Sequence, residues 1–146
     1  MNLYTRALGY LVRREYSRQE LERKLSRHEH TLDEIKNILD RLEQQKLLSD
    51  ERAAEQILHA RSRKYGSKRI RYELQMKGIT DHLIEAAMKD FEQTEFSCAR
   101  ALWYKKFGGV SSTPAERGKQ IRYLAGKGFP SEVISRVLCD TREIEN

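Results

Sequence analysis

Proline and cysteine are scarce in this chain of 146 residues, which contains two of each. Proline occurs only at positions 114 and 130, and no stretch alternates apolar with polar residues for long. The sequence therefore predicts helices and no β-strands. Cys98 and Cys139 lack the spacing of metal ligands and lie in segments with helical patterning. We expect two reduced structural thiols in a cytoplasmic protein.

Long apolar runs and known catalytic motifs are also missing. No stretch approaches the roughly 20 apolar residues that a membrane span needs, and the first 15 residues do not have the pattern of a signal peptide. The chain has no G-x-x-x-x-G-K-[ST] phosphate loop, and His28-Glu29-His30 lacks the one-turn spacing of a metalloprotease helix. We expect no membrane segment, metal site, cofactor or enzymatic activity.

Helix start signals, by contrast, recur along the chain. A Ser or Thr followed three residues later by Glu can cap a helix, because each side chain bonds an otherwise unpaired backbone group. Apolar residues at helical spacing follow these signals and predict amphipathic helices. The expected starts are Ser17-x-x-Glu20, Thr31-x-x-Glu34, Thr80 after a stop at Gly78, and Thr113-Pro114. Two of the expected faces are Leu32, Ile35, Ile38, Leu39 and Leu42, and Leu83, Ile84, Ala87, Met88 and Phe91.

These faces superpose when the sequence is compared with itself. A shift of 49 residues aligns Tyr16 with Tyr65 and Leu21 with Ile70. Further along, Ile70-Arg71-Tyr72 pairs with Ile121-Arg122-Tyr123 and, after a one-residue gap, Lys77-Gly78-Ile79 pairs with Lys127-Gly128-Phe129. We predict an all-α, elongated tandem array of three three-helix units with about nine helices and no β-sheet. The expected boundaries are 1–48, 49–94 and 95–139, followed by a tail over 140–146.

Charge follows the same repeat. The formal net charge of the chain is +6. Residues 61–78 and residues 100–127 each contain seven Lys and Arg and one acidic residue, whereas residues 31–60 contain four Lys and Arg and seven acidic residues. Basic surface at regular intervals suits a long anionic partner such as DNA. The alternative interpretation is that alternating charge only keeps a helical repeat protein soluble.

The basic side chains expected at the partner surface form a track that crosses from the second repeat into the third. Because Ile70 and Leu74 should face the core, Lys64, Lys68 and Arg71 should point outward. The full set of predicted contact residues is Arg13, Arg14, Lys64, Lys68, Arg69, Arg71, Lys105, Lys106 and Arg122.

Two long strings resemble the signatures of the RecX family. The first is Ala7-x-x-Tyr10-Leu11-x-x-Arg14-x-Tyr16-Ser17-x-x-Glu20-Leu21-x-x-Lys24-Leu25, and the second is Tyr65-Gly66-x-x-Arg69-Ile70-x-x-Glu73-Leu74-x-x-x-Gly78-Ile79. Residues 97–139 match the family more loosely. One departure is that Ala53-Ala54 follows Asp50-Glu51-Arg52, where the family usually has an aromatic residue. We expect thinner and less rigid packing between the first two repeats.

The resemblance implies a regulator that acts by binding rather than by catalysis. The resemblance implies that the chain lies along the groove of a RecA nucleoprotein filament and suppresses strand exchange, ATP turnover and coprotease activity, with a role in recombination, DNA repair and the SOS response. The resemblance therefore implies RecA and single- or double-stranded DNA as partners of a cytoplasmic monomer. Whether the basic faces contact DNA, RecA or both stays open, as does filament capping versus groove binding.

Two other functions also fit the residues. A helix-turn-helix DNA-binding factor has similar three-helix units, although it would concentrate base-reading side chains on one helix and would dimerise. A repeat scaffold that binds an acidic protein without nucleic acid is the third possibility.

Overall fold

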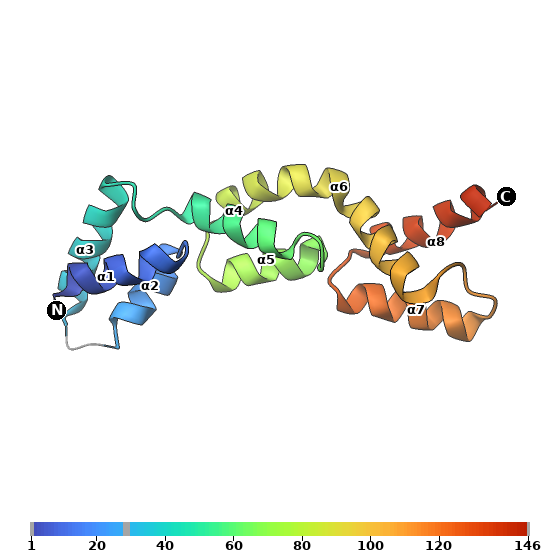
Figure 1. The fold of residues 1–146 in the computed structure, drawn as a ribbon, viewed down its shortest axis with the longest axis horizontal. Coiled ribbons are helices and arrows are strands. Elements are labelled where there is room, and N and C mark those ends of the chain that lie inside the picture. Colours follow the sequence, from blue (N-terminus) through green and yellow to red (C-terminus); the bar gives the residue numbers. More distant parts are fainter. Residues whose placement is uncertain (1, 28–29, 146) are drawn as a thin grey trace. The chain divides into compact units, whose positions relative to one another are not determined.

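The computed structural model describes residues 2–27 and 30–145, with side chains described up to residue 139. The described chain is helical and contains no strand (Figure 1). Its eight helices are α1 (Leu3–Arg13), α2 (Arg18–Leu25), α3 (Leu32–Gln44), α4 (Asp50–Arg61), α5 (Ser67–Met76), α6 (Asp81–Phe107), α7 (Pro114–Gly126) and α8 (Ser131–Glu145). The all-α prediction is confirmed.

The chain forms two compact units. Unit 1 comprises residues 1–57 and 74–86, and unit 2 comprises residues 58–73 and 87–146. Repeat one, with helices α1–α3, lies within unit 1, and repeat three, with the end of α6 and helices α7–α8, lies within unit 2. Repeat two, with helices α4, α5 and the start of α6, contributes residues to both units.

In unit 1, helices α1, α2 and α3 contact one another pairwise. Helix α2 begins with the predicted capping box, because the Ser17 hydroxyl accepts from Glu20 N and the Glu20 carboxylate accepts from Ser17 N. At α3 only half of the predicted box forms: Thr31 caps Glu34 N, while the Glu34 carboxylate contacts His30 Nδ1 at 3.0 Å. The core consists of Leu3, Ala7, Tyr16, Leu21, Leu25, Ile35, Leu39, Leu42 and Leu48. Leu32, which was expected on the same face as Ile35 and Leu39, is instead 53% exposed at the start of α3.

The first residue of α4 and the residue that follows α5 are both hydrogen-bonded to repeat one inside unit 1. The Ser17 hydroxyl donates to Lys77 O at 2.7 Å, and Arg18 N donates to Asp50 Oδ1 at 2.7 Å. Ala53 and Ala54 are each 1% exposed, so these small residues are fully enclosed. The reduced rigidity expected at this position stays a prediction.

In unit 2, helix α6 corrects the expected number of helices. It runs without a break from Asp81 to Phe107, across the expected boundary at 94/95, and so replaces two of the nine predicted helices. Its last turns pack with α7 and α8 around a core of Ala99, Trp103, Leu124, Phe129, Ile134, Val137 and Leu138. Helix α8 extends to Glu145, so the backbone of the expected tail is helical up to that residue.

The predicted alignment of repeat three is wrong by one residue in α7. Ile70 and Leu74 are buried, and their counterparts are Gln120 and Leu124, which are also buried, whereas Ile121 is 37% exposed. Gln120 occupies an interior position because its amide is satisfied there: it accepts from Trp103 Nε1 at 2.9 Å and donates to Gly109 O. A shift of 50 residues therefore relates the buried positions of α5 to those of α7, as it relates the two Lys-Gly-apolar strings.

The turn before α5 is held against the end of α7. Gly66 N donates to Lys127 O at 2.8 Å, and Lys68 N donates to Gly128 O at 2.9 Å. A buried carboxylate also takes part, since Ser67 N donates to Glu95 Oε2 at 2.6 Å. These backbone bonds fix α5 relative to α7 within unit 2.

Candidate nucleic-acid interface

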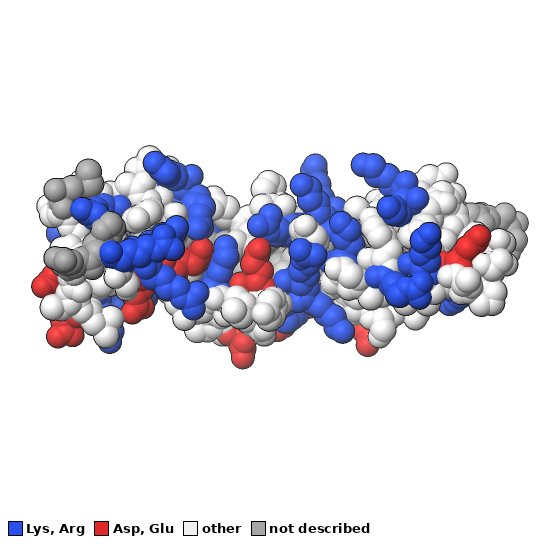
Figure 2. Space-filling model, turned by 90° about the horizontal axis from the view of Figure 1, so that it is seen from below, with Lys and Arg blue, Asp and Glu red and all other residues white. Residues whose placement is uncertain are grey.

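Seven of the nine predicted contact residues lie in one compact unit. Unit 2 holds the cations expected on α5, on the end of α6 and on α7, while unit 1 holds Arg13 and Arg14. The residues in unit 2 are Lys64, Lys68, Arg69, Arg71, Lys105, Lys106 and Arg122. On the face seen in Figure 2, Lys and Arg side chains outnumber Asp and Glu side chains.

Six of these side chains are exposed lysines or arginines without a carboxylate partner in the described part of the chain: Lys64, Lys68, Arg69, Lys105, Lys106 and Arg122. Arg71 differs, because its guanidinium pairs with Glu92 at 2.9 Å and its side chain is 28% exposed. Lys64 and Lys68 are thus exposed as expected, whereas Arg71 is half-buried and already paired. Arg122, which the sequence paired with Arg71, is the counterpart of Tyr72 in the corrected alignment.

The two predicted residues of unit 1 differ from each other. Arg13 is exposed at the end of α1. The Arg14 guanidinium lies 3.6 Å from the centre of the Tyr16 ring and pairs with Glu20 at 3.0 Å, and it also donates to Glu15 O. Arg14 is therefore committed to contacts inside repeat one, which leaves Arg13 as the available cation of this pair.

The Glu20 carboxylate shows how repeat one uses charge. Burial by itself raises the pKa of Glu20, but the bond from Ser17 N, the bond from Arg14 and the charge of Lys77 outweigh it, so the pKa is lowered. Lys77 Nζ lies 3.4 Å from Glu20 Oε2. The anion is therefore held between two cations and a helix N-terminus.

Aromatic rings connect the basic side chains of unit 2, and the sequence analysis did not select them. The Tyr65 ring has the Arg69 guanidinium 4.0 Å from its centre and Lys127 Nζ at 5.4 Å. Lys127 Nζ also lies 5.8 Å from the centre of the Tyr123 ring, which has Lys106 Nζ at 5.7 Å. Cations and rings alternate from α5 through the end of α7 to α6, an arrangement in which each contact is favourable.

A signal for two of the missed residues was present in the sequence. Lys127 belongs to the repeated Lys-Gly-apolar string, and Tyr65 belongs to the repeated Tyr that precedes the second helix of repeats one and two. Both were interpreted as structural positions. Their proximity to Arg69 results from the backbone bonds between residues 66–68 and 127–128, which spacing alone does not predict.

Other kinds of site have little support in the described residues. No group of three or more His, Cys, Asp or Glu side chains there could hold a metal ion, and His28 and Glu29 lie outside those residues. Cys98 is half-buried, its thiol donates to Ser62 O, and burial raises the pKa of this thiol. None of the described helices is long and apolar enough to span a bilayer.

Comparison with known proteins matches all three repeats in order. The first, second and third three-helix domains of RecX match residues 4–42, 49–88 and 93–138. The chain belongs to the RecX family. The regulatory protein RecX of Ralstonia pickettii is 40% identical over 144 residues, which cover 99% of this chain and 91% of the relative. That of Herminiimonas arsenicoxydans is 36% identical over 146 residues, covering 100% and 97%.

The fold agrees with solved RecX structures. A crystal structure of RecX from Lactobacillus salivarius superposes with a TM-score of 0.85 at 24% identity, covering 97% of this chain and 95% of the other. A second crystal structure, of a regulatory protein RecX, gives 0.78 over 92% and 70%. The tandem arrangement of three three-helix domains is thus a RecX fold, and the regulatory role is that of the family.

Proposed function

We propose that this protein binds RecA nucleoprotein filaments, slows their ATP hydrolysis and strand exchange, and thereby regulates recombination and DNA repair. Its similarity to proteins called regulatory protein RecX supports a regulatory role. RecA as the partner follows from the resemblance of residues 7–25 and 65–79 to the RecX signatures.

The observation that carries this proposal is the surplus of exposed cations in unit 2. Unit 2 contains 16 Lys and Arg against nine Asp and Glu, a net charge of +7. A recombinase filament contains a long DNA strand with regularly spaced phosphates, and lysines without carboxylate partners can neutralise such phosphates. Contacts repeated along a filament would oppose the changes between subunits that accompany ATP turnover.

The test measures RecA ATP hydrolysis on single-stranded DNA as this protein is added, up to an equimolar amount. We expect hydrolysis and strand exchange to slow. We expect Lys64→Glu with Lys68→Glu to raise the half-inhibitory concentration about 25-fold or more, because two phosphate contacts are lost and become repulsive. The matched control is Arg23→Glu with Arg27→Glu, which reverses two exposed charges in repeat one.

Two results would overturn the proposal. Unchanged recombinase rates at saturating protein would reject RecA inhibition, and sequence-selective binding to duplex DNA would then favour a helix-turn-helix factor. Equal inhibition by the two charge-reversed variants would show that unit 2 is not the contact surface. Far-ultraviolet circular dichroism checks that both variants keep the wild-type helical content.

A further inference from the structure

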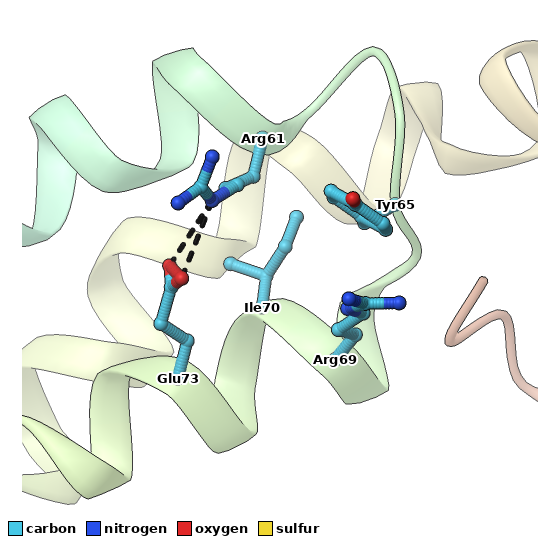
Figure 3. A pocket seen from close by; sticks show the side chains of 5 residues that line it. All are labelled: Arg61, Tyr65, Arg69, Ile70 and Glu73. Carbon is cyan, nitrogen blue, oxygen red and sulfur yellow. Dashed lines mark hydrogen bonds and ion pairs between the residues drawn. The ribbon is translucent and has the colours of Figure 1, made fainter. Parts of the chain in front are cut away.

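Helices α4 and α5 border a small cleft inside unit 2. It encloses about 150 Å³ and is lined by Arg61, Tyr65, Arg69, Ile70 and Glu73 (Figure 3). Two of its five lining residues are arginines and one is a tyrosine, and Ile70 forms its apolar floor. Arginine pairs in such a setting are suited to bind an oxyanion, because the guanidinium presents several N–H donors in a planar fork.

Arg69 supplies a cation that is positioned but not neutralised. Its guanidinium lies against the Tyr65 ring, 4.0 Å from the ring centre, and it has no carboxylate partner in the described part of the chain. Lys127 Nζ lies 5.4 Å from the same ring centre. Stacking on the ring limits the motion of the guanidinium and leaves its N–H groups at the edge available to a ligand.

Arg61 is only partly occupied by Glu73. The contact is made by its Nε, which lies 3.2 and 3.4 Å from the two oxygens of the Glu73 carboxylate (Figure 3). The Arg61 and Glu73 side chains are 46% and 28% exposed. An ion pair this exposed contributes little stability, so a ligand can rearrange it at low cost.

Repeat one shows that the fold does not require these charges. It builds the same turn around Tyr16, yet the residue at the position of Arg61 is Val12, and the residues at the positions of Arg69 and Glu73 are Glu20 and Lys24. There the acid caps α2 and pairs with Arg14. The two arginines of the cleft are therefore a feature of repeat two and not a requirement of the three-helix unit.

We propose that this cleft binds one backbone phosphodiester of a single DNA strand through Arg61 and Arg69, and that Glu73 competes with the phosphate for Arg61. The inference deepens the proposed function by naming a subsite in the DNA contact surface. Charge favours a phosphodiester: the two arginines and Glu73 carry a net +1, which one phosphodiester neutralises, whereas inorganic phosphate at neutral pH brings more negative charge.

The experiment uses the full chain and a fluorescein-labelled 20-nucleotide oligo(dT), with binding followed by anisotropy at 0.1 M salt. Removing the competing carboxylate with Glu73→Gln should tighten binding about threefold, with little change in the log–log salt slope, because the phosphate no longer has to displace a weak exposed ion pair. Arg61→Gln should weaken binding about fivefold at 0.1 M salt, because the loss of one phosphate contact flattens the log–log salt slope by about 0.7. Lys24→Gln, at the position of Glu73 in repeat one, should change affinity less than twofold.

The double variant separates a specific site from a general charge effect. If Glu73 acts by occupying Arg61, the Arg61→Gln, Glu73→Gln protein should bind like Arg61→Gln alone, which is a non-additive result. Additive effects, or no change in Glu73→Gln, would overturn the proposal. Arg61→Lys provides a second test if Arg61→Gln loses helical content, since it keeps the charge but loses the planar fork and should weaken binding about threefold.

Two further measurements identify the ligand and distinguish a failure of the subsite from a failure of the proposed function. Displacement of the oligonucleotide by millimolar inorganic phosphate, but not by chloride at equal ionic strength, would overturn the assignment to a strand phosphodiester. RecA ATP hydrolysis is measured in parallel with the wild-type protein. If the wild type fails to inhibit RecA while the anisotropy results hold, the proposed function fails and the subsite stands. If inhibition holds and the variants bind alike, only the subsite fails.

Discussion

Unit 1 contains 12 Lys and Arg and 13 Asp and Glu, a net charge of −1, whereas the corresponding net charge of unit 2 is +7. Unit 1 pairs its charges internally: Arg52 with Glu15, Arg14 and Lys77 with Glu20, and Arg18 with Asp40 and Glu43. Unit 2 also has ion pairs, between Arg61 and Glu73 and between Arg71 and Glu92, and cations stack on tyrosine rings in both units, so the difference lies in the surplus of exposed cations in unit 2. Repeats with the same fold can thus use charged side chains either for internal ion pairs or as an exposed surface for a partner.

The same Lys-Gly-apolar string ends the second helix of repeat two in unit 1 and of repeat three in unit 2, but its surroundings differ. Gly78 has a φ of +76°, and a Cβ there would meet the side chain of Gln19. Gly128 has a φ of +96°, and a Cβ there would meet Arg69, with its backbone nitrogen at 2.8 Å. The Gln19 side chain can move aside, whereas the backbone at Arg69 cannot, because the neighbouring Gly66 N and Lys68 N are bonded to Lys127 O and Gly128 O. A methyl group added at each glycine therefore tests the difference between the two positions.

The largest expected effect is therefore on stability. Gly128→Ala should lower the free energy of unfolding by about 3 kcal/mol or more, from positive φ and overlap with the α5 backbone. Gly78→Ala should cost about 1–2 kcal/mol, mostly from positive φ. Urea unfolding followed by circular dichroism measures both.

Gly126→Ala is the matched control, because no atom lies within 4 Å of its Cβ position and it is at the end of α7. This variant should be neutral or stabilise the protein by up to about 1 kcal/mol. Equal losses in the Gly78 and Gly128 variants would mean that the backbone contact between α5 and α7 contributes nothing specific.

The difference in charge predicts the next largest effect, on DNA affinity. Lys105→Gln with Lys106→Gln removes two cations of unit 2, and if both contact phosphates the log–log salt slope should flatten by about 1.4, which is about a 25-fold loss of single-strand affinity at 0.1 M salt. Arg23→Gln with Arg27→Gln removes two exposed cations of unit 1 and should change affinity about twofold. Anisotropy titrations at several salt concentrations give both slopes, and similar losses in the two variants would leave only a diffuse effect of net charge.

Local signals in the sequence predicted the helices well. Ser17 with Glu20 and Thr113 with Pro114 start helices where expected, because a cap depends on residues within one turn. The continuity of α6 was missed because the boundary at 94/95 came from superposing repeats, although residues 92–99 contain no Gly or Pro. The register of α7 was missed because Gln120 is polar, and only the folded chain shows that Trp103 satisfies it.

Part of the candidate site could likewise be predicted from local features of the sequence. Composition identifies a basic segment, and helical periodicity correctly placed Lys64 and Lys68 at the surface. Whether a cation is already paired depends on residues distant in sequence, such as Glu92 for Arg71, 21 positions away. The alternation of Tyr65, Lys127 and Tyr123 depends likewise on a contact across about 60 residues, which no local pattern encodes.

The smallest expected effect is within unit 1, where the two carboxylates that accept backbone N–H bonds at the start of α2, Glu20 and Asp50, have pKa values shifted in opposite directions. The pKa of Glu20 is lowered, so its stabilising contribution is present above the ordinary glutamate pKa of about 4.3 and is lost as the pH falls through the folded-state value. The pKa of Asp50 is raised, mainly by burial and only partly offset by the bond from Arg18 N. Its contribution is therefore greatest at low pH and declines as the pH rises through the folded-state value.

Glu20→Gln should accordingly lower stability at pH 7 by about 1 kcal/mol, through loss of the charged capping partner, and the difference from wild type should shrink below about pH 4. Asp50→Asn keeps an oxygen that can accept from Arg18 N but removes the buried charge. It should leave stability at pH 7 unchanged or raise it slightly, and the gain should vanish in acid. Amide hydrogen exchange of α2 between pH 3 and pH 7, together with urea unfolding, measures both effects. Opposite signs for the two variants at pH 7 are the expected result. A loss of similar size in both would mean that Asp50 acts in unit 1 as Glu20 does, as a stabilising anion whose burial is outweighed by its bond to Arg18.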